Sequence, residues 1–355
     1  SIDNVSVKEY LGQEVVPESG CGSWLWEPQS TNLLEYSENF ISGNWVKDDV
    51  TILSDLSISP SGESNSSIVV VNTVASRHNL KRAKAGVNTA TLSIFAKAKE
   101  LSYIQIASAN TTGQFANFDL SNGTIGSVGS SFSDAKIENY GNGWYRCSVV
   151  SDNQYNQAIF SLVTSPTSPW LETWTSSNNT DGLYIWGAML DENSFITSYI
   201  PTSGSTVTRN QDVCTNGGSL ASINSTEGVL YAEIAINQND NGDFRLISMT
   251  DASDSVRIGF GKKNYQAKWY IKILIGALNI TSQAIDFQEG FQKIAIRYKS
   301  GDSGVYINGT KVITDTSNYV NTLIIDNVSF DFTGNAFPFF GKTKALAVWK
   351  EALSD

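Results

Sequence analysis

The sequence predicts an all-β protein built from two tandem β-sandwich, or jelly-roll, modules. Apolar and polar residues alternate along many short segments, as they do in strands that bury one face. Turn residues such as Asn-Gly and Gly-Asn-Gly separate these segments. No window longer than about ten residues keeps the apolar spacing of an amphipathic helix. The 355 residues are 41% hydrophobic and 17% charged, which is enough apolar material for more than one core.

The alternation is clearest in three segments. In TLSIFAKAK (91–99), Leu92, Ile94 and Ala96 share one face of the predicted strand. The same pattern recurs in VLYAEIAIN (229–237) and KWYIKILIG (268–276). Each segment is therefore expected to form a strand with one face in a core.

Other segments predict buried strands and a hairpin. SSIVVV and GLYIWGAML carry apolar residues on both faces, which is typical of strands buried on both sides, and Trp144 and Trp186 are expected in the core. GVYINGTKVIT places Asn308 and Gly309 between two strand-like runs. Because both residues tolerate positive φ angles, this pair predicts a two-residue β-hairpin.

Two polar, loop-like stretches suggest the domain boundaries. Residues 13–23 follow a strand-like start, and residues 201–219 are rich in Ser, Thr and Gly with little apolar periodicity. We therefore expect residues 1–12 to be a linker or the last strand of a preceding module. Residues 13–212 would then form a jelly-roll module, and residues 213–355 a second sandwich.

Charge and hydropathy exclude several kinds of partner. The formal net charge of −11 argues against nucleic acid, because phosphate binding needs clustered Lys and Arg. No apolar run reaches the roughly 18 residues of a transmembrane helix, so no membrane insertion is expected. The first ten residues lack the pattern of a signal peptide, which favours a piece of a longer chain or a processed product.

The three cysteines do not suggest a metal site. Cys147 lies in a strand-like run and is expected to be a buried free thiol. Cys21 and Cys214 lie near the two ends of the first module, and whether they pair stays open, because spacing alone cannot decide it. No Cys-x-x-Cys or Cys/His cluster suggests zinc.

The first module resembles a known family through blocks that occur in order. The blocks are LWEPQSTNLLEYSENF, SIFAKAKELSYIQI, FDLSNGTIGSVG, AKIENYGNGWYRCSV and GLYIWGAMLDENSFITSYIPTSGSTVTRNQDV. They look like a module common in phage and prophage tail fibres and other virion surface proteins, with a layout similar to jelly-roll carbohydrate-binding modules. The resemblance covers residues 22–213. Ser30 departs from it, because a basic residue is expected there.

The second module is similar to concanavalin-A-like, laminin-G-like domains. The blocks that carry this resemblance are EGVLYAEIAI, FQKIAIRYKSGDSGVYINGTKVI and FFGKTKALAVWKEALSD. Together the two resemblances imply adhesion modules that bind a polysaccharide or a cell-surface glycan, located in a virion or outside the cell. Fibres are commonly trimeric, so a homotrimer is implied as well, although no heptad repeat supports one.

Sugar binding directs attention to aromatic and basic side chains. Trp170 and Trp174 lie in a loop-like stretch rich in Pro, Ser and Asn, and Trp45 is the next candidate for stacking on a sugar ring. Basic residues in ASRHNLKRAK could bind an anionic sugar, although a solvated strand surface is the simpler interpretation. The candidates in that run are Arg77, His78 and Arg82. In the opening stretch, Trp24, Trp26, Leu33 and Leu34 are expected to anchor the start of the first module.

Catalysis is the main alternative function. A polysaccharide-degrading enzyme, either a glycanase or a lyase such as a tail depolymerase, would need paired carboxylates or a Gln/His and Tyr set. Neither is recognisable, since Glu233 stands alone on its predicted strand and His78 is the single histidine. A purely structural virion module is a second alternative. Asp240 and Asp243 are the candidate ligands for a structural Ca²⁺, against a solvated hairpin tip, and no other cofactor is expected.

Overall fold

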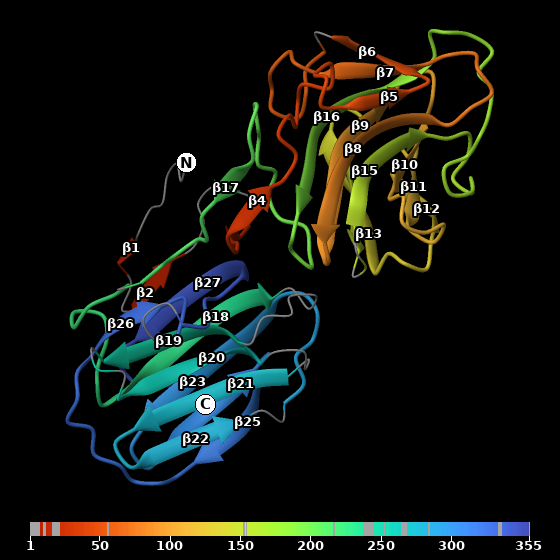
Figure 1. The fold of residues 1–355 in the computed structure, drawn as a ribbon. Helices are drawn as coiled ribbons and strands as arrows, with labels where there is room; N and C mark the ends of the chain where they lie inside the picture. The colour runs from red at the N-terminus through yellow and green to blue at the C-terminus, as the bar shows by residue number, and fades with distance from the viewer. Residues whose placement is uncertain are drawn as a thin grey trace. The chain divides into compact units, whose positions relative to one another are not determined.

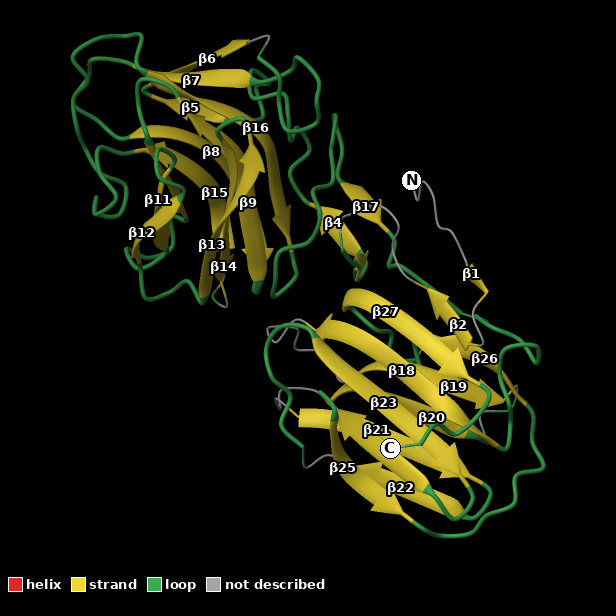
Figure 2. Cartoon of the chain, turned by 180° about the vertical axis from the view of Figure 1, so that it is seen from behind, coloured by secondary structure: helices red, strands yellow, loops and turns green. Residues whose placement is uncertain are grey.

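The computed structural model describes residues 8–9, 12–15, 22–54, 57–151, 153, 155–215, 217–236, 244–251, 253, 255–263, 268–282, 285–332 and 336–354. All regular elements in these ranges are β-strands, which confirms the predicted all-β class of sandwich modules. The chain divides into two compact units (Figures 1 and 2). Gln29–Asn210 forms the central sandwich, and Ser1–Pro28 with Gln211–Asp355 forms the terminal sandwich.

The central sandwich contains two six-stranded antiparallel sheets and a short strand pair. The first sheet has the order β12 (Thr124–Val128), β11 (Phe115–Asp119), β10 (Tyr103–Ala107), β15 (Tyr155–Leu162), β8 (His78–Val87) and β5 (Val46–Asp48). The second has the order β13 (Asp134–Gly141), β14 (Trp144–Ser151), β9 (Ala90–Ala98), β16 (Gly182–Asp191), β7 (Ser67–Val71) and β6 (Val50–Ser54). The separate pair is β4 (Ser30–Asn32) with β17 (Val207–Arg209).

The core of the central sandwich is made by the alternating residues of both sheets. Leu92 and Ile94 of β9 are fully buried, as the alternation predicted, and they meet Ile106 and Phe160 from the other sheet in one apolar cluster. The predicted deep burial of β7 and β16 is confirmed, since β7 is buried along its whole length. Trp144 and Trp186 are buried too, but in a smaller cluster with Phe95 on the outer side of the second sheet.

The terminal sandwich contains an eight-stranded and a five-stranded sheet. The larger sheet has the order β1 (Lys8–Glu9), β2 (Gly12–Val15), β27 (Gly341–Trp349), β18 (Glu227–Ile236), β23 (Gln292–Lys299), β24 (Ser303–Ile307) and β25 (Thr310–Asp315), with β3 (Trp24–Trp26) also paired to β27. The smaller sheet has the order β22 (Leu278–Ser282), β21 (Lys268–Ile275), β20 (Arg257–Lys263), β19 (Phe244–Asp251) and β26 (Ile325–Ser329). Residues 13–15, which the sequence analysis grouped with the first module, lie in this larger sheet.

Period-2 alternation also builds the core of the terminal sandwich. Trp269 is fully buried together with Ile271 and Ile273 of β21, while the intervening residues face outward. The predicted hairpin is confirmed, because β24 and β25 pair across Asn308 and Gly309. These two residues have φ angles of 50° and 82°, the left-handed values that a type I′ turn requires.

The opening aromatic stretch is divided between the two units. Leu34 is fully buried in the central core, as expected for an anchor. Trp26 instead stacks on Phe330 of the terminal sandwich, with ring centroids 4.3 Å apart. The reason is backbone pairing: β3 is hydrogen-bonded to β27 at Gly341–Thr343, which commits the tryptophan to that sheet.

No helix long and apolar enough to span a membrane occurs in the part of the chain that the structure describes.

Candidate functional site

A long loop between β15 and β16, residues 163–181, brings four of the predicted site residues together. Trp170 and Trp174 lie on the loop itself, and Arg77 and His78 lie where β8 begins. The backbone of Ser76 exchanges two hydrogen bonds with that of Trp174, at 3.1 and 3.0 Å. Because the register of this exchange is fixed, the loop lies directly against the start of β8.

Two buried amide side chains hold the loop on the outer face of the first sheet. Gln105 and Asn117 are fully buried on β10 and β11 and are joined by a 2.7 Å hydrogen bond. Gln105 donates to the carbonyl of Pro169 and accepts from the Leu171 amide, while Asn117 donates to the carbonyl of Ser168. The loop is therefore tied down by strand side chains, because its buried backbone groups need partners.

Trp170 is half-buried at the edge of this loop. Its indole Nε1 donates to the carbonyl of Ser108 at 3.0 Å, and its ring packs beside the apolar cluster of Ala107 and Ile159. The exposed Arg77 side chain lies over the ring, with Cζ 5.2 Å from a ring centroid, which is a cation–π arrangement. We call this pair the Arg77–Trp170 surface.

Trp174 and His78 serve mainly to fix the loop. Trp174 donates its indole N–H to the carbonyl of Leu162 and packs against the core. His78 is fully buried, with Nδ1 2.9 Å from the carbonyl of Asp49 and Nε2 3.3 Å from the carbonyl of Trp174. Its ring contacts Trp174 edge-on, at 4.7 Å between centroids. With no exposed surface, His78 can support a ligand site only through Trp174.

The remaining basic and aromatic candidates lie elsewhere. Trp45 is only 2% exposed in the core, where it donates to the carbonyl of Tyr36, so its indole offers no face to a ligand. Its ring packs on that of Phe40, with centroids 5.3 Å apart. Arg82 forms an ion pair with Glu35 at 3.0 Å. Burial alone would raise the pKa of Glu35, but hydrogen bonds and the positive charge of Arg82 outweigh it and lower this pKa.

The described residues give no support for a metal site, and two predictions fall outside them. Asp240 and Asp243, the candidate calcium ligands, and Cys21 are not among the described residues. Within the described ranges, no group of three or more His, Cys, Asp or Glu side chains is placed to hold a metal ion. Cys147 is a buried free thiol, as predicted, and burial raises its pKa; Cys214 is also a free thiol.

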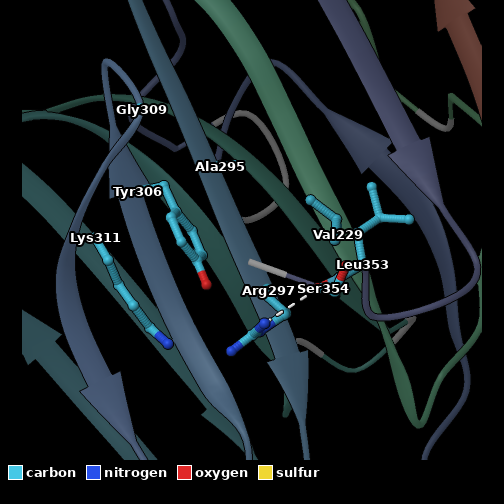
Figure 3. Close-up of a pocket in the computed structure, with 8 residues that line it drawn as sticks. All are labelled: Val229, Ala295, Arg297, Tyr306, Gly309, Lys311, Leu353 and Ser354. Carbon is cyan, nitrogen blue, oxygen red and sulfur yellow. Dashed lines mark hydrogen bonds between the residues drawn. The ribbon is translucent and has the colours of Figure 1, made fainter.

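A second candidate site, which the sequence analysis missed, is a pocket of about 410 Å³ on the terminal sandwich (Figure 3). It lies over β18, β23, β24 and β25, and Leu353 and Ser354 also line it. Its lining residues are Val229, Ala295, Arg297, Tyr306, Gly309, Lys311, Leu353 and Ser354. The alternation of the strands indicated which side chains face outward, but not that small and large ones would leave a hollow.

Comparison with known proteins gives only low similarity to solved structures. No protein-family model and no curated protein matches the sequence. Among solved structures, the chain is similar to domains LG4-5 of the mouse laminin alpha1 chain, at 10% identity and a TM-score of 0.27, over 80% of this chain and 90% of that one. It is also similar to the LG1-3 region of the laminin alpha2 chain, at 9% identity and a TM-score of 0.28, over 79% of this chain and 66% of that one. The residues of this chain therefore carry the functional argument.

Proposed function

We propose that the central sandwich recognises a surface polysaccharide without cleaving it, as part of a virion surface or tail-fibre protein or another extracellular protein. The observation that carries the proposal is the Arg77–Trp170 surface, where an exposed guanidinium lies over a half-buried indole. Aromatic and arginine side chains placed together in this way supply apolar area and several hydrogen-bond donors at one spot.

A saccharide fits this surface chemically. Pyranose rings present C–H groups that bury well against indole carbons, while their hydroxyl oxygens need N–H donors at the rim. The guanidinium of Arg77 provides such donors and can also bind a carboxylate in two-point fashion. Arg77 and Trp170 thus supply both halves of a sugar-binding contact.

Hydrogen bonds hold the loop that carries Trp170 in one conformation. Glu172 accepts hydrogen bonds from the Thr164 amide at 2.8 Å and from the Ser168 hydroxyl at 2.8 Å, so the loop is tied within itself as well as to Gln105 and Asn117. A site that is already ordered loses less conformational entropy on binding. This rigidity favours a binding role for Trp170 over that of a loose surface residue.

Substitution of Trp170 tests the proposal. When the chain is run through gels that contain bacterial or algal polysaccharides, at least one polysaccharide should retain it. Trp170→Ala should weaken the binding of that polysaccharide at least about tenfold, which is the usual loss when a central aromatic contact is removed. Tyr140→Ala is the matched control. Tyr140 is 49% exposed on β13 of the other sheet, and its loss should leave binding unchanged.

Three results would overturn the proposal. In the first, none of the polysaccharides in the panel retains the chain. In the second, the Trp170→Ala variant binds as tightly as the wild-type chain. The third is the release of reducing ends or unsaturated uronates from the bound polysaccharide, which would establish a degrading enzyme instead. For each comparison, the far-ultraviolet circular dichroism spectrum must show that the variant is folded.

A further inference from the structure

Two cationic side chains are neighbours on the outer face of the smaller sheet of the terminal sandwich. Ile258 of β20 and Ile273 of β21 lie opposite each other in the register, and both are buried in the core. The adjacent residues Arg257 and Lys272 therefore project from the other side of the sheet. Lys272 lies opposite Gly259, two residues beyond Arg257, so the two cations are diagonal neighbours within reach of each other's long side chains.

Both cations have neutral partners only, in the part of the chain that the structure describes. The ammonium of Lys272 donates to Oδ1 of Asn279 at 2.6 Å and to Oγ1 of Thr281 at 2.8 Å, which leaves one of its three N–H groups. Cζ of Arg257 lies 5.2 Å from the centroid of the Phe332 ring, and no described residue accepts a hydrogen bond from its guanidinium. Neither cation therefore has an ion-pair partner among the described residues.

The strands around the two cations carry no acid, although the chain as a whole is acidic, with 35 Asp and Glu against 24 Lys and Arg. Residues 256–282, which contain β20, β21 and β22, include one arginine and four lysines but no Asp or Glu. The residues that lie in register with the two cations across the outer face are neutral as well. They are Asn327, Thr250, Leu274 and Asn279 in the row of Arg257, and Ser329, Ser248, Gly259 and Thr281 in the row of Lys272.

The two positive charges repel each other. Burial, and after it the charge of Arg257, lowers the pKa of Lys272, so the folded chain holds the ammonium form less tightly than free lysine does. An anion bound between the two side chains would relieve this repulsion, because each charge would then have an opposite partner.

An aromatic contact holds Arg257 in place. The buried ring of Phe332 lies beside its guanidinium and also packs edge-on against Tyr270 of β21, with centroids 6.2 Å apart. A cation–π contact uses the face of a guanidinium, whereas its N–H donors lie in the plane. The donors of Arg257 are therefore free to bind two oxygens of one anion.

We propose that Arg257 and Lys272 bind a phosphate group, as the dianion of a phosphomonoester. Two of its oxygens would accept hydrogen bonds from the guanidinium of Arg257, and a third would accept from the remaining N–H of Lys272. A phosphomonoester carries close to two negative charges at neutral pH and so matches two cations without acidic partners, whereas a carboxylate or a sulfate ester carries one. This site does not depend on the Arg77–Trp170 surface or its ligand, since both residues belong to the terminal sandwich.

Calorimetric titration of the full chain with methyl phosphate at pH 7.5 and low ionic strength tests the proposal. Methyl sulfate, which has the same shape but one charge, and acetate, which has one charge on a planar group, are the comparison ligands. We expect methyl phosphate to bind at least about tenfold more tightly than either, since a charge-assisted hydrogen bond is worth about that factor or more.

Three variants of the chain locate the site. Lys272→Met should weaken the binding of methyl phosphate about tenfold, because it removes the charge but keeps the length of the side chain. Arg257→Gln should weaken it by at least as much, because it removes both the charge and the two-point contact. Lys293→Met is the matched control: Lys293 is exposed on β23 of the other sheet, so the loss of its charge should leave binding unchanged.

Each other outcome would overturn the proposal. If methyl phosphate does not bind, or binds no more tightly than methyl sulfate or acetate, the two cations do not form a phosphate site. Equal losses in Lys272→Met and Lys293→Met would indicate general electrostatic attraction. Unchanged binding in Lys272→Met, which keeps the apolar stem of the side chain and so tests the site even where Arg257→Gln does not fold, would place the ligand elsewhere on the chain.

Discussion

Replacing Asn32 with alanine is expected to lower the melting temperature of the central sandwich by roughly 10 °C, through a loss of about 4 kcal/mol of stability. The Asn32 side chain is fully buried, and each end of its amide has two partners. Its Nδ2 donates to the carbonyls of Ala188 and Ile200, at 3.2 and 2.7 Å. Its Oδ1 accepts from the amides of Leu34 and Leu190, at 3.1 and 3.3 Å.

The large effect follows from what remains after the substitution. Alanine would leave four backbone groups without their side-chain partner inside a dry core, and each unsatisfied group costs about 1–3 kcal/mol before relaxation. Asn32 also joins the start of the central sandwich to β16 and to the segment that follows it, which are far from Asn32 in sequence. The loss is therefore structural and does not concern the ligand surface.

Differential scanning calorimetry of the wild-type and variant chains measures this effect. The two compact units should unfold in separate transitions, and Asn32→Ala should lower only one of them. Asn65→Ala is the control, because Asn65 is exposed and donates to Glu38 at 3.3 Å, so its loss should cost no more than about 0.5 kcal/mol. An unchanged profile for Asn32→Ala would contradict the structural assignment, and so would an equal fall of both transitions.

Replacing Asp191 with asparagine is expected to stabilise the central sandwich by up to about 3 kcal/mol at pH 7.5. Asp191 is 1% exposed, and burial raises its pKa to about 6 although hydrogen bonds to its carboxylate oppose the shift. The donors are the Ser30 and Thr197 hydroxyls, at 3.1 and 3.0 Å, and the Asn193 amide, at 3.1 Å. Asparagine keeps an acceptor, and its amide can donate to the hydroxyl oxygens.

The sign of the effect follows from the raised pKa. The folded state binds the proton more tightly than the unfolded chain, whose Asp pKa is about 3.9. The stabilisation is therefore complete below about pH 4 and is lost as the pH rises through about 6. Asparagine does not ionise, so its advantage over aspartate should grow from near zero at pH 4 to its full value above pH 7.

Urea unfolding of the wild-type and Asp191→Asn chains between pH 4 and 8 measures the difference. Thr73→Ala, which changes an exposed side chain of the same unit that does not ionise, should give a difference that stays flat with pH. An Asp191→Asn difference that is independent of pH, or that favours the wild-type chain more strongly at pH 7.5 than at pH 4, would contradict the raised pKa.

The strands could be predicted from the sequence because their signals are local. Period-2 alternation identified the buried faces of β9 and β21, and Asn308-Gly309 identified the hairpin, since each pattern reports the geometry of a few adjacent residues. The loop position of Trp170 was also predicted from a local pattern, the Pro, Ser and Asn residues around it. The contact between Trp170 and Arg77 depends on a loop crossing a sheet face, which no local pattern encodes.

Side-chain roles that depend on distant partners were beyond the sequence. Ser30 departs from the resemblance at a position where a basic residue was expected, and it is buried against Asp191 instead of facing a ligand. Trp45 was a candidate for stacking on a sugar ring, yet its ring lies in the core. The pocket around Tyr306 needed the register of three strands, which fixes the small residues that face the large ones.

Hydrogen exchange with the polysaccharide that the chain retains tests the central claim most directly. Amide exchange is compared by mass spectrometry with and without the polysaccharide. Residues 163–174 and the segment around Arg77 should become protected in its presence, because the Arg77–Trp170 surface would be covered. Protection in neither segment, despite measurable binding, would contradict the assignment of this surface as the polysaccharide site.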